Sequence, residues 1–323
     1  MSQQIVPPRS SAENRARVVV GLDGSAGSRA ALEQAWLRAA RSGAVLDVVS
    51  VLPVQHVWSR PAPDVQRQDE ALADTQIRAR ALVDEVVSEG VAGAVEVRVR
   101  AVPGSPAGAL VEAAEGAAAL VVGSRGRGAV RSAVLGSVAL HCVTHARCPV
   151  EVVHAAPDQR ASGVVVGVDG SAESFGALRV AIGEAVARGT TVRVVAAWEV
   201  GNMWSDMYAL TGPEKNSVRT RLQDAVASAV ADAQQEAADV HSRPPLLTID
   251  VAEGPPSDLL VTAAEGAELL VVGSRGHGAI RGLLLGSVAL RCVVHAPCPV
   301  LVVPPPRRAA PAEEELAPAT AQT

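Results

Sequence analysis

The sequence has few aromatic residues and no excess of positive charge. Its 323 residues include one Phe, one Tyr and four Trp, and the formal net charge is -5. Proteins that bind nucleic acid need a basic surface for the phosphates and, for single strands, aromatic rings that stack on the bases. The composition therefore argues against nucleic acid as a partner.

The first residues show no signal-peptide pattern, and long hydrophobic runs are also missing. The first residues, MSQQIVPPRSSAENRAR, contain no apolar core of a signal peptide, and no run of eighteen or more apolar residues follows. Four cysteines in a chain of this length are typical of reduced thiols rather than of a disulfide framework. We expect a soluble, cytoplasmic protein with no membrane partner.

What the sequence does contain is a long internal repeat. RVVVGLDGSAGSRAAL (17–32) matches GVVVGVDGSAESFGAL (163–178), and VTHARCPVEVV (143–153) matches VVHAPCPVLVV (293–303). Each copy is long enough to fold as a domain. We therefore expect a disordered N-terminus (1–16), a first domain (17–154), a linker (155–162), a second domain (163–303) and a disordered Pro- and Ala-rich tail (304–323).

Within each copy, short β-branched runs alternate with longer segments of helical spacing. In the first copy the predicted strands are 18–20, 45–51, 95–99, 120–122 and 150–153, and the predicted helices are 28–41, 77–89, 106–115 and 136–145. This alternation favours a doubly wound α/β domain, with a parallel sheet covered on both faces. The last strands, 150–153 and 300–303, are short and apolar, so we expect them to pair with each other within the chain.

Both copies carry the same glycine-spaced loop after a predicted strand. VVGSRGRGAVRSAVLGSVAL (121–140) and VVGSRGHGAIRGLLLGSVAL (271–290) share the spacing G-x2-G-x9-G-S. Ligands bind at the carboxyl ends of parallel strands, glycine lets backbone N–H groups approach an anion, and a helix N-terminus adds donors and a positive dipole end. We expect a phosphate cradle in each half, with Arg125 and Arg127 supplying charge. The hydroxyl of Ser137 would cap the helix or bind a phosphate.

Other readings of the loop are weaker. A single glycine-rich turn is often only a turn, but two copies with intact spacing favour a functional role. The P-loop motif and the G-x-S-x-G nucleophile elbow are both absent, and the only lysine is Lys215. No general base for hydrolysis is evident either.

The motifs together carry a resemblance to a known family. With VGLDGS and VGVDGS after the first strand of each copy, the two glycine loops, and HARCPV and HAPCPV before the last strand, the chain resembles tandem universal stress proteins of the ATP-binding subclass from about Arg17 to Val303. For each half the resemblance implies a five-stranded parallel sheet of the Rossmann-like, adenine nucleotide alpha hydrolase-like type. It further implies ATP binding, with or without Mg²⁺, dimerisation through the last strands and a regulatory role under stress.

The resemblance, together with the position and charge of the loop residues, predicts which residues bind the nucleotide. In the first half they are Gly21, Asp23, Val51, Gly123, Ser124, Arg125, Gly126, Arg127, Gly128, Gly136, Ser137 and Val138. In the second half they are Gly167, Asp169, Ala197, Gly273, Ser274, Arg275, Gly276, His277, Gly278, Gly286, Ser287 and Val288.

The roles of some of these residues can be argued from charge and position. Asp23 and Asp169 would repel a triphosphate, so we expect them to bind the ribose, with an Asx-type turn as the alternative. Adenine would lie near Val51 and Ala197, and we expect the neighbouring Trp198 to be core rather than a stacking wall. His277 replaces Arg127 in the second loop, so that site binds ATP less tightly as pH rises if the side chain faces the phosphates; otherwise the side chain points into solvent.

The cysteines recur with a histidine between them. Cys142, His145 and Cys148 are repeated as Cys292, His295 and Cys298. Three ligands make a poor structural zinc site, so we expect buried structural thiols and no metal.

Three functions follow from these features. The leading one is an ATP-binding regulator of stress or growth adaptation, with one site per domain and an unidentified protein partner. A slow ATPase or phosphotransferase, and an interaction scaffold stabilised by ATP, remain the alternatives. A homodimer is expected beyond the pairing of the two domains.

Overall fold

The structure is a computed structural model of the chain. It describes residues 15–53, 65–88, 94–126, 135–154, 160–198, 212–240, 243–276 and 284–305. Residues 15–154 are called the first half below, and residues 160–305 the second half. The expected disordered ends and most of the expected linker lie outside the described residues, so those expectations stay predictions.

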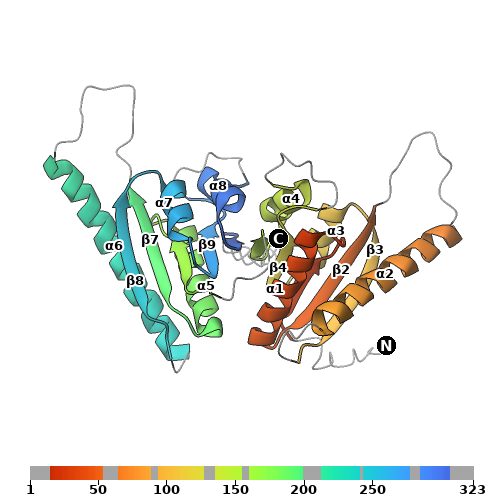
Figure 1. Ribbon diagram of the computed structural model, residues 1–323. Coiled ribbons are helices and arrows are strands. Elements are labelled where there is room, and N and C mark those ends of the chain that lie inside the picture. The colour runs from red at the N-terminus through yellow and green to blue at the C-terminus, as the bar shows by residue number, and fades with distance from the viewer. Residues whose placement is uncertain are drawn as a thin grey trace, which may run out of the picture.

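Strands and helices alternate along both halves (Figure 1). The first half contains β1 (Arg17–Gly21), α1 (Ala26–Ser42), β2 (Val45–Pro53), α2 (Val65–Ser88), β3 (Val97–Gly104), α3 (Pro106–Ala113), β4 (Ala119–Gly123), α4 (Ser137–His145) and β5 (Val150–Val153). The second half contains β6 (Val164–Gly167), α5 (Ala172–Arg188), β7 (Val192–Trp198), α6 (Gly212–Val240), β8 (Leu247–Glu253), α7 (Pro256–Ala263), β9 (Leu269–Gly273), α8 (Ser287–His295) and β10 (Val300–Val303).

The strands of both halves join into one sheet. Its ten strands lie in the order β3-β2-β1-β4-β5-β10-β9-β6-β7-β8, and all pairs within a half are parallel. The two halves meet where β5 and β10 pair antiparallel, with Val152 opposite Val300 and Glu151 opposite Leu301. The doubly wound α/β fold is confirmed, and so is the expected pairing of the two last strands within the chain.

Helices cover both faces of this sheet. In the first half α1 and α2 pack on one face, against residues such as Val18, Val20 and Leu46. The alternate residues, such as Val19, point to the other face, where α3 and α4 lie. Figure 1 shows the carboxyl ends of the strands along its upper edge, so residues that follow these strands gather there.

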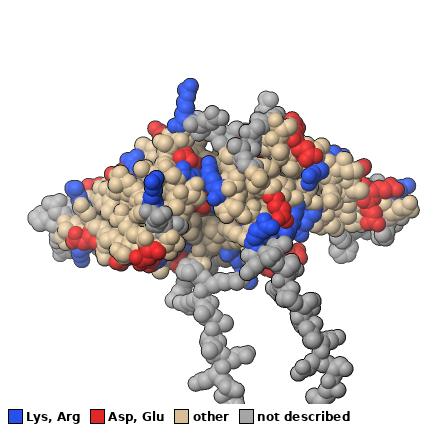
Figure 2. All heavy atoms as spheres, turned by 90° about the horizontal axis from the view of Figure 1, so that it is seen from below, with Lys and Arg blue, Asp and Glu red and all other residues tan. Residues whose placement is uncertain are grey.

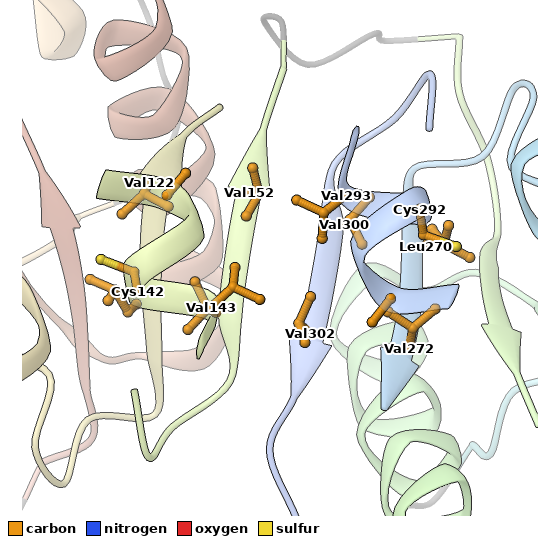
Figure 3. Packing of buried hydrophobic residues seen from close by; sticks show 14 of the residues in the cluster. Val122, Cys142, Val143, Val152, Leu270, Val272, Cys292, Val293, Val300 and Val302 are labelled. Carbon is orange, nitrogen blue, oxygen red and sulfur yellow. The ribbon is translucent and has the colours of Figure 1, made fainter. Parts of the chain in front are cut away.

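On the face covered by α3, α4, α7 and α8, one hydrophobic cluster crosses from half to half (Figure 3). Val152 of β5 and Val300 of β10 lie at its centre, and the buried Cys142 and Cys292 of the two helices pack within it. The two halves therefore share a core as well as a sheet.

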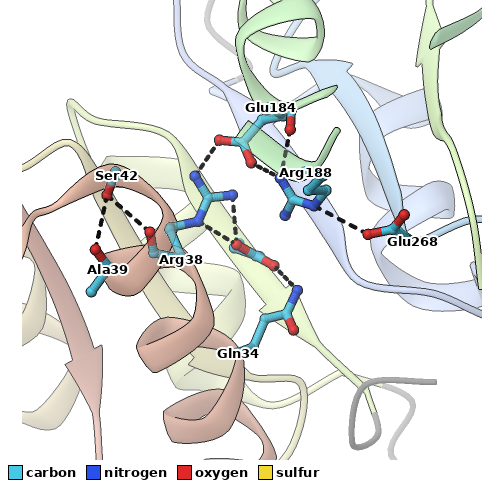
Figure 4. A network of polar contacts seen from close by, with 8 residues as sticks. Gln34, Arg38, Ala39, Ser42, Glu184, Arg188 and Glu268 are labelled. Atoms are coloured by element: carbon cyan, nitrogen blue, oxygen red, sulfur yellow. Dashed lines mark hydrogen bonds and ion pairs between the residues drawn. The ribbon is translucent and has the colours of Figure 1, made fainter. Parts of the chain in front are cut away.

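The other face of the junction is polar (Figure 4). Arg38 of α1 contacts Glu151 of β5 with its Nε at 2.8 Å, and it also pairs with Glu184 of α5. Gln34 donates to the second oxygen of Glu151 at 3.0 Å, and Arg188 pairs with Glu184. Glu151 is 0% exposed, so the two halves enclose a charged network between the hydrophobic clusters of α1 and α5.

Capping residues explain where α1 and α5 begin and end. Ser25 caps α1, because its hydroxyl accepts a hydrogen bond from the backbone N–H of Ser28 at 3.2 Å. Gly43 ends the helix with φ 63°, a left-handed conformation that favours glycine. Ser171 and Gly189 repeat both features in α5.

Two elements of the first half differ from the sequence-based prediction. The helix expected at 77–89 begins at Val65. The sequence pattern missed its first turns because residues 66–76 are mostly exposed and carry no buried apolar stripe. The strand expected at 95–99 runs from Val97 to Gly104. β3 lies at the edge of the sheet. Pro103 has no backbone N–H to donate, and edge strands tolerate proline for this reason. The other predicted elements of this half agree to within two residues at each end.

The surface carries charges of both signs. On the face opposite the carboxyl ends of the strands, acidic and basic residues are interspersed among uncharged ones (Figure 2). Among the described residues, no helix is both long and apolar enough to cross a bilayer.

Candidate functional site

The glycine loop of each half is closed by a backbone hydrogen bond. Gly136 donates its N–H to the carbonyl of Ser124 at 2.7 Å, and Gly286 donates to Ser274 at 2.8 Å. Each bond joins the start of the loop, just after β4 or β9, to the residue immediately before α4 or α8. The structure therefore brings Gly123–Gly126 together with Gly136–Val138, and Gly273–Gly276 with Gly286–Val288.

The helices that follow these loops begin without a side-chain cap. Gly136 is the N-cap of α4 and Gly286 that of α8, and neither helix start has a side-chain cap hydrogen bond among the described residues. Ser137 is the first helical residue, so the expectation that its hydroxyl caps the helix is wrong. No side chain accepts a hydrogen bond from the first N–H groups of α4 and α8 among the described residues, whereas Ser25 and Ser171 accept one in α1 and α5.

Several glycines allow close approaches at the site. A Cβ on Gly123 would lie 2.6 Å from the backbone of Gly27 in α1. A Cβ on Gly126 would lie 2.7 Å from Oδ2 of Asp23, and one on Gly276 would lie 2.3 Å from Oδ2 of Asp169. These positions are glycine because the loop lies directly against other parts of the protein.

Asp23 and Asp169 stabilise the turns after β1 and β6. Oδ1 of Asp23 accepts a hydrogen bond from the N–H of Ser25 at 2.9 Å, and Oδ1 of Asp169 accepts from the N–H of Ser171 at 3.0 Å. The structure therefore contains the Asx-type turn that was the alternative to a ribose contact. The second oxygen of each carboxylate is the one that lies beside the loop glycine, so both acids border the site.

The remaining expected residues are placed as follows. Gly21 and Gly167 end β1 and β6, and a Cβ there would touch Leu110 or Leu260 at 2.8 or 2.9 Å. Val51 and Ala197 lie half-buried in β2 and β7. Trp198 is also half-buried, so the expectation that it belongs to the core is wrong, because it lies at the end of β7. Arg127, Gly128, His277 and Gly278 lie outside the described residues.

A cavity of about 460 Å³ adjoins the first loop on the side of α1. It is lined by Ser25, Ala26, Gly27, Arg29, Ala30 and Glu33 of the α1 segment, by Ser124, Arg125 and Gly126, and by His154 after β5. The sequence analysis predicted Ser124, Arg125 and Gly126 as binding residues but missed the part of the cavity formed by the α1 segment and His154. The available signal was His154 itself, which stands where the second copy has Pro304.

His154 links this cavity to the second half. Its Nε2 lies 2.7 Å from the carbonyl oxygen of Val293 in α8. Burial lowers the pKa of His154 and the positive charge of Arg125 lowers it too, while the backbone groups of Val293 and Cys298 partly oppose these effects. The ring is therefore neutral near pH 7, since the ordinary pKa of histidine is already about 6.5.

The cysteines are buried free thiols, as expected. Burial raises the pKa of Cys142 to about 12 and that of Cys148 to about 11. His145 is exposed, and its Nδ1 lies 3.0 Å from the carbonyl of His141. Among the described residues, no group of three or more His, Cys, Asp or Glu side chains is arranged to hold a metal ion.

Comparison with known proteins identifies the family. The sequence model of the Universal stress protein family matches residues 14–154 and 162–304. A universal stress protein of Mycobacterium tuberculosis is 34% identical over 294 residues, which cover 88% of this chain and 96% of the relative. The crystal structure of a universal stress protein from Archaeoglobus fulgidus is similar with a TM-score of 0.62 and 17% identity, over 90% of this chain and 96% of that one.

A second solved structure covers one half only. It is a universal stress protein in complex with cAMP, 30% identical, with a TM-score of 0.32 over 44% of this chain and 98% of its own.

Proposed function

Since the chain belongs to the universal stress protein family, we propose that it binds an adenine nucleotide, ATP, once in each half and acts as a nucleotide-dependent regulator of stress or growth adaptation. The observation that carries this proposal is the pair of helix starts without a side-chain cap, Gly136–Val138 and Gly286–Val288, each hydrogen-bonded to the start of a glycine loop. Open N–H groups at a helix start are suited to phosphate, because the helix dipole adds positive potential there.

Each part of the nucleotide has a place in this proposal. The phosphates bind Gly123, Gly126 and the first N–H groups of α4, and the equivalent groups of the second half. Asp23 and Asp169 border the loop and receive the ribose hydroxyls with the oxygen that the turn does not use. The base lies toward Val51 and Ala197. Mg²⁺ enters only as the usual companion of ATP, and no protein ligand is assigned to it.

A proline at the first helical position tests the phosphate contact without disturbing the helix. Ser137→Pro removes one N–H and one hydroxyl from the proposed site, and proline is favoured at this position of a helix. The residue before it, Gly136, already has the extended conformation that precedes proline (ψ 149°). Ser287→Pro is the same change in the second half.

The measurement is calorimetric titration of nucleotide-free protein with ATP. We expect two ATP per chain for the unchanged protein and one for each variant. Ala172→Pro, at the first position of the serine-capped α5, is the matched control and should keep both sites. Absence of ATP binding by folded, ligand-free protein, or two intact sites in both serine variants, would refute the proposal.

The alternatives are separated by turnover. A slow ATPase predicts release of ADP and phosphate from bound ATP, and a phosphotransferase predicts ADP and a phosphorylated acceptor. In both cases the rate should fall in the proline variants. A scaffold stabilised by ATP predicts that the partner still binds when both serines are replaced by proline. The regulator predicts that partner binding changes with nucleotide occupancy.

A further inference from the structure

The cavity beside α1 combines small-molecule size with uncompensated positive charge. Its volume of about 460 Å³ falls within the range of small-ligand pockets. Of its two arginines, Arg29 pairs with Glu85 at 2.9 Å and lies 3.7 Å from Glu33. Arg125 makes no ion pair with any described residue, so its charge is available to a ligand.

The tautomer of His154 follows from its contact with α8. A carbonyl oxygen only accepts hydrogen bonds, so Nε2 must carry the hydrogen that it shares with Val293 at 2.7 Å. In the neutral ring Nδ1 is then an unprotonated acceptor. That atom is buried and has no hydrogen-bond partner among the described residues. A group that supplies or stabilises a proton at Nδ1 would satisfy it.

The two halves differ in the wall of this cavity. Ser25, Ser124, Arg125 and Gly126 have the same residue types at the equivalent positions Ser171, Ser274, Arg275 and Gly276. The residues that differ are Gly27, Arg29, Ala30, Glu33 and His154, whose equivalents are Glu173, Phe175, Gly176, Arg179 and Pro304. Both halves therefore have the same glycine loop, whereas the second half has a glutamate in place of Gly27 and a proline in place of His154.

We propose that this cavity is a second kind of ligand site, present in the first half only, that binds a small phosphorylated molecule through Arg125 and His154. A phosphate dianion suits two cationic groups, and its negative charge favours protonation of His154 at Nδ1. Binding therefore takes up a proton at His154. Arg125, Arg29 and Glu33 are the charged groups that line the cavity with it, and the uncharged backbone groups of Val293 in α8 and of Cys298 before β10 face the ring.

The site is distinct from the proposed nucleotide sites. The wall of the cavity formed by α1 lies on one face of the sheet, whereas Gly136–Val138 begin α4 on the opposite face. Residues 124–126 border both, so a ligand in one can affect the other. The inference does not depend on ATP binding, because its residues Arg125 and His154 and its proton uptake can be measured with a phosphate probe alone.

The test uses the full chain and inorganic pyrophosphate as the probe. Titration of the unchanged protein should show binding that weakens about tenfold between pH 6 and pH 8, as the proton at His154 is lost. His154→Gln keeps a donor for the carbonyl of Val293 but cannot gain the proton. It should weaken binding at pH 6 about tenfold and remove most of the pH dependence.

Two further measurements make the result decisive. His145→Gln is the matched control, since His145 is exposed on α4, and it should bind like the unchanged protein. In the unchanged protein, pyrophosphate should shift the ring ¹⁵N resonances of His154 toward the protonated form.

No pyrophosphate binding, or equal affinity and pH dependence in His154→Gln, would overturn the proposal. Pyrophosphate bound only at the glycine loops would leave His154 unprotonated and would overturn it too. Failure of ATP binding alone would count against the proposed function and leave this inference standing.

Discussion

Arg38 is the residue on which the buried charge between the halves depends. Its guanidinium contacts the fully buried Glu151 at 2.7 and 2.8 Å and also pairs with Glu184. Arg38→Met keeps much of the volume and leaves Glu151 with Gln34 as its remaining partner. Because an uncompensated buried charge is costly, we expect the free energy of unfolding to fall by about 3 kcal/mol.

Urea denaturation measures this change. The control is Arg80→Met, which removes an exposed ion pair with Asp84 on α2 and should cost less than about 0.5 kcal/mol. A loss in Arg38→Met no larger than that of the control would show that Glu151 needs no positive partner.

Gly126 illustrates a second prediction at the residue scale. A Cβ at this position would lie 2.7 Å from Oδ2 of Asp23, so the substitution displaces the acid as well as narrowing the approach to the loop. We expect Gly126→Ala to abolish one of the two proposed ATP sites, as measured by the stoichiometry of calorimetric titration. Gly183→Ala is the matched control: no atom lies within 4 Å of the added Cβ, and alanine should stabilise α5 by about 1 kcal/mol. Two intact sites in Gly126→Ala would contradict the assignment of this loop.

At the scale of elements, α1 and α5 meet through equivalent positions that carry opposite charges. Arg38 of α1 and Glu184 of α5 match in the internal repeat. Burial opposes the ionisation of Glu184, but Arg38 and Arg188 outweigh it and hold the pKa of Glu184 below its ordinary value. The contact therefore favours pairing of unlike halves, because two equal halves would place like charges together.

This pKa shift has a defined effect on stability. A glutamate whose pKa is lowered on folding stabilises the protein above its ordinary pKa of about 4.3, and this contribution is lost as pH falls through the lower, folded value. We expect the free energy of unfolding to decrease from pH 5 to pH 3, and Glu184→Gln to show a shallower decrease. Denaturation curves at several pH values measure both slopes, and identical slopes would show that Glu184 contributes nothing to the acid response.

The elements also show how far the sequence could predict the structure. Buried strands such as β4 and β5 were predicted closely, because a run of β-branched residues between turn signals has few alternatives. The start of α2 was missed because its first turns are mostly exposed, so helix propensity rather than periodicity decides it. The glycine loops were found because glycine spacing is visible in the chain. The cavity at His154 was not, because it depends on α1, β5 and α8 meeting in space.

At the scale of the whole molecule, the two halves form one sheet with a shared core. The cluster on the face of α3, α4, α7 and α8 contains residues of both halves, and β5 pairs with β10 across the junction. Disruption of either half therefore removes contacts from the other. We expect the described chain to unfold in a single cooperative transition rather than one domain at a time.

Leu301 tests this cooperativity from the second half. It is 0% exposed in β10 and lies opposite Glu151 of the first half. Leu301→Ala should lower the free energy of unfolding by about 3 kcal/mol, since a buried leucine is replaced by a cavity. Hydrogen exchange resolved by segment should show the loss in β1 and β6 alike, because both strands open only when the shared sheet opens. Leu246→Ala, at a position 68% exposed, is the control and should leave both unchanged. If β6 loses protection while β1 keeps it, the halves unfold separately, and a ligand bound in one could not stabilise the other through the shared core.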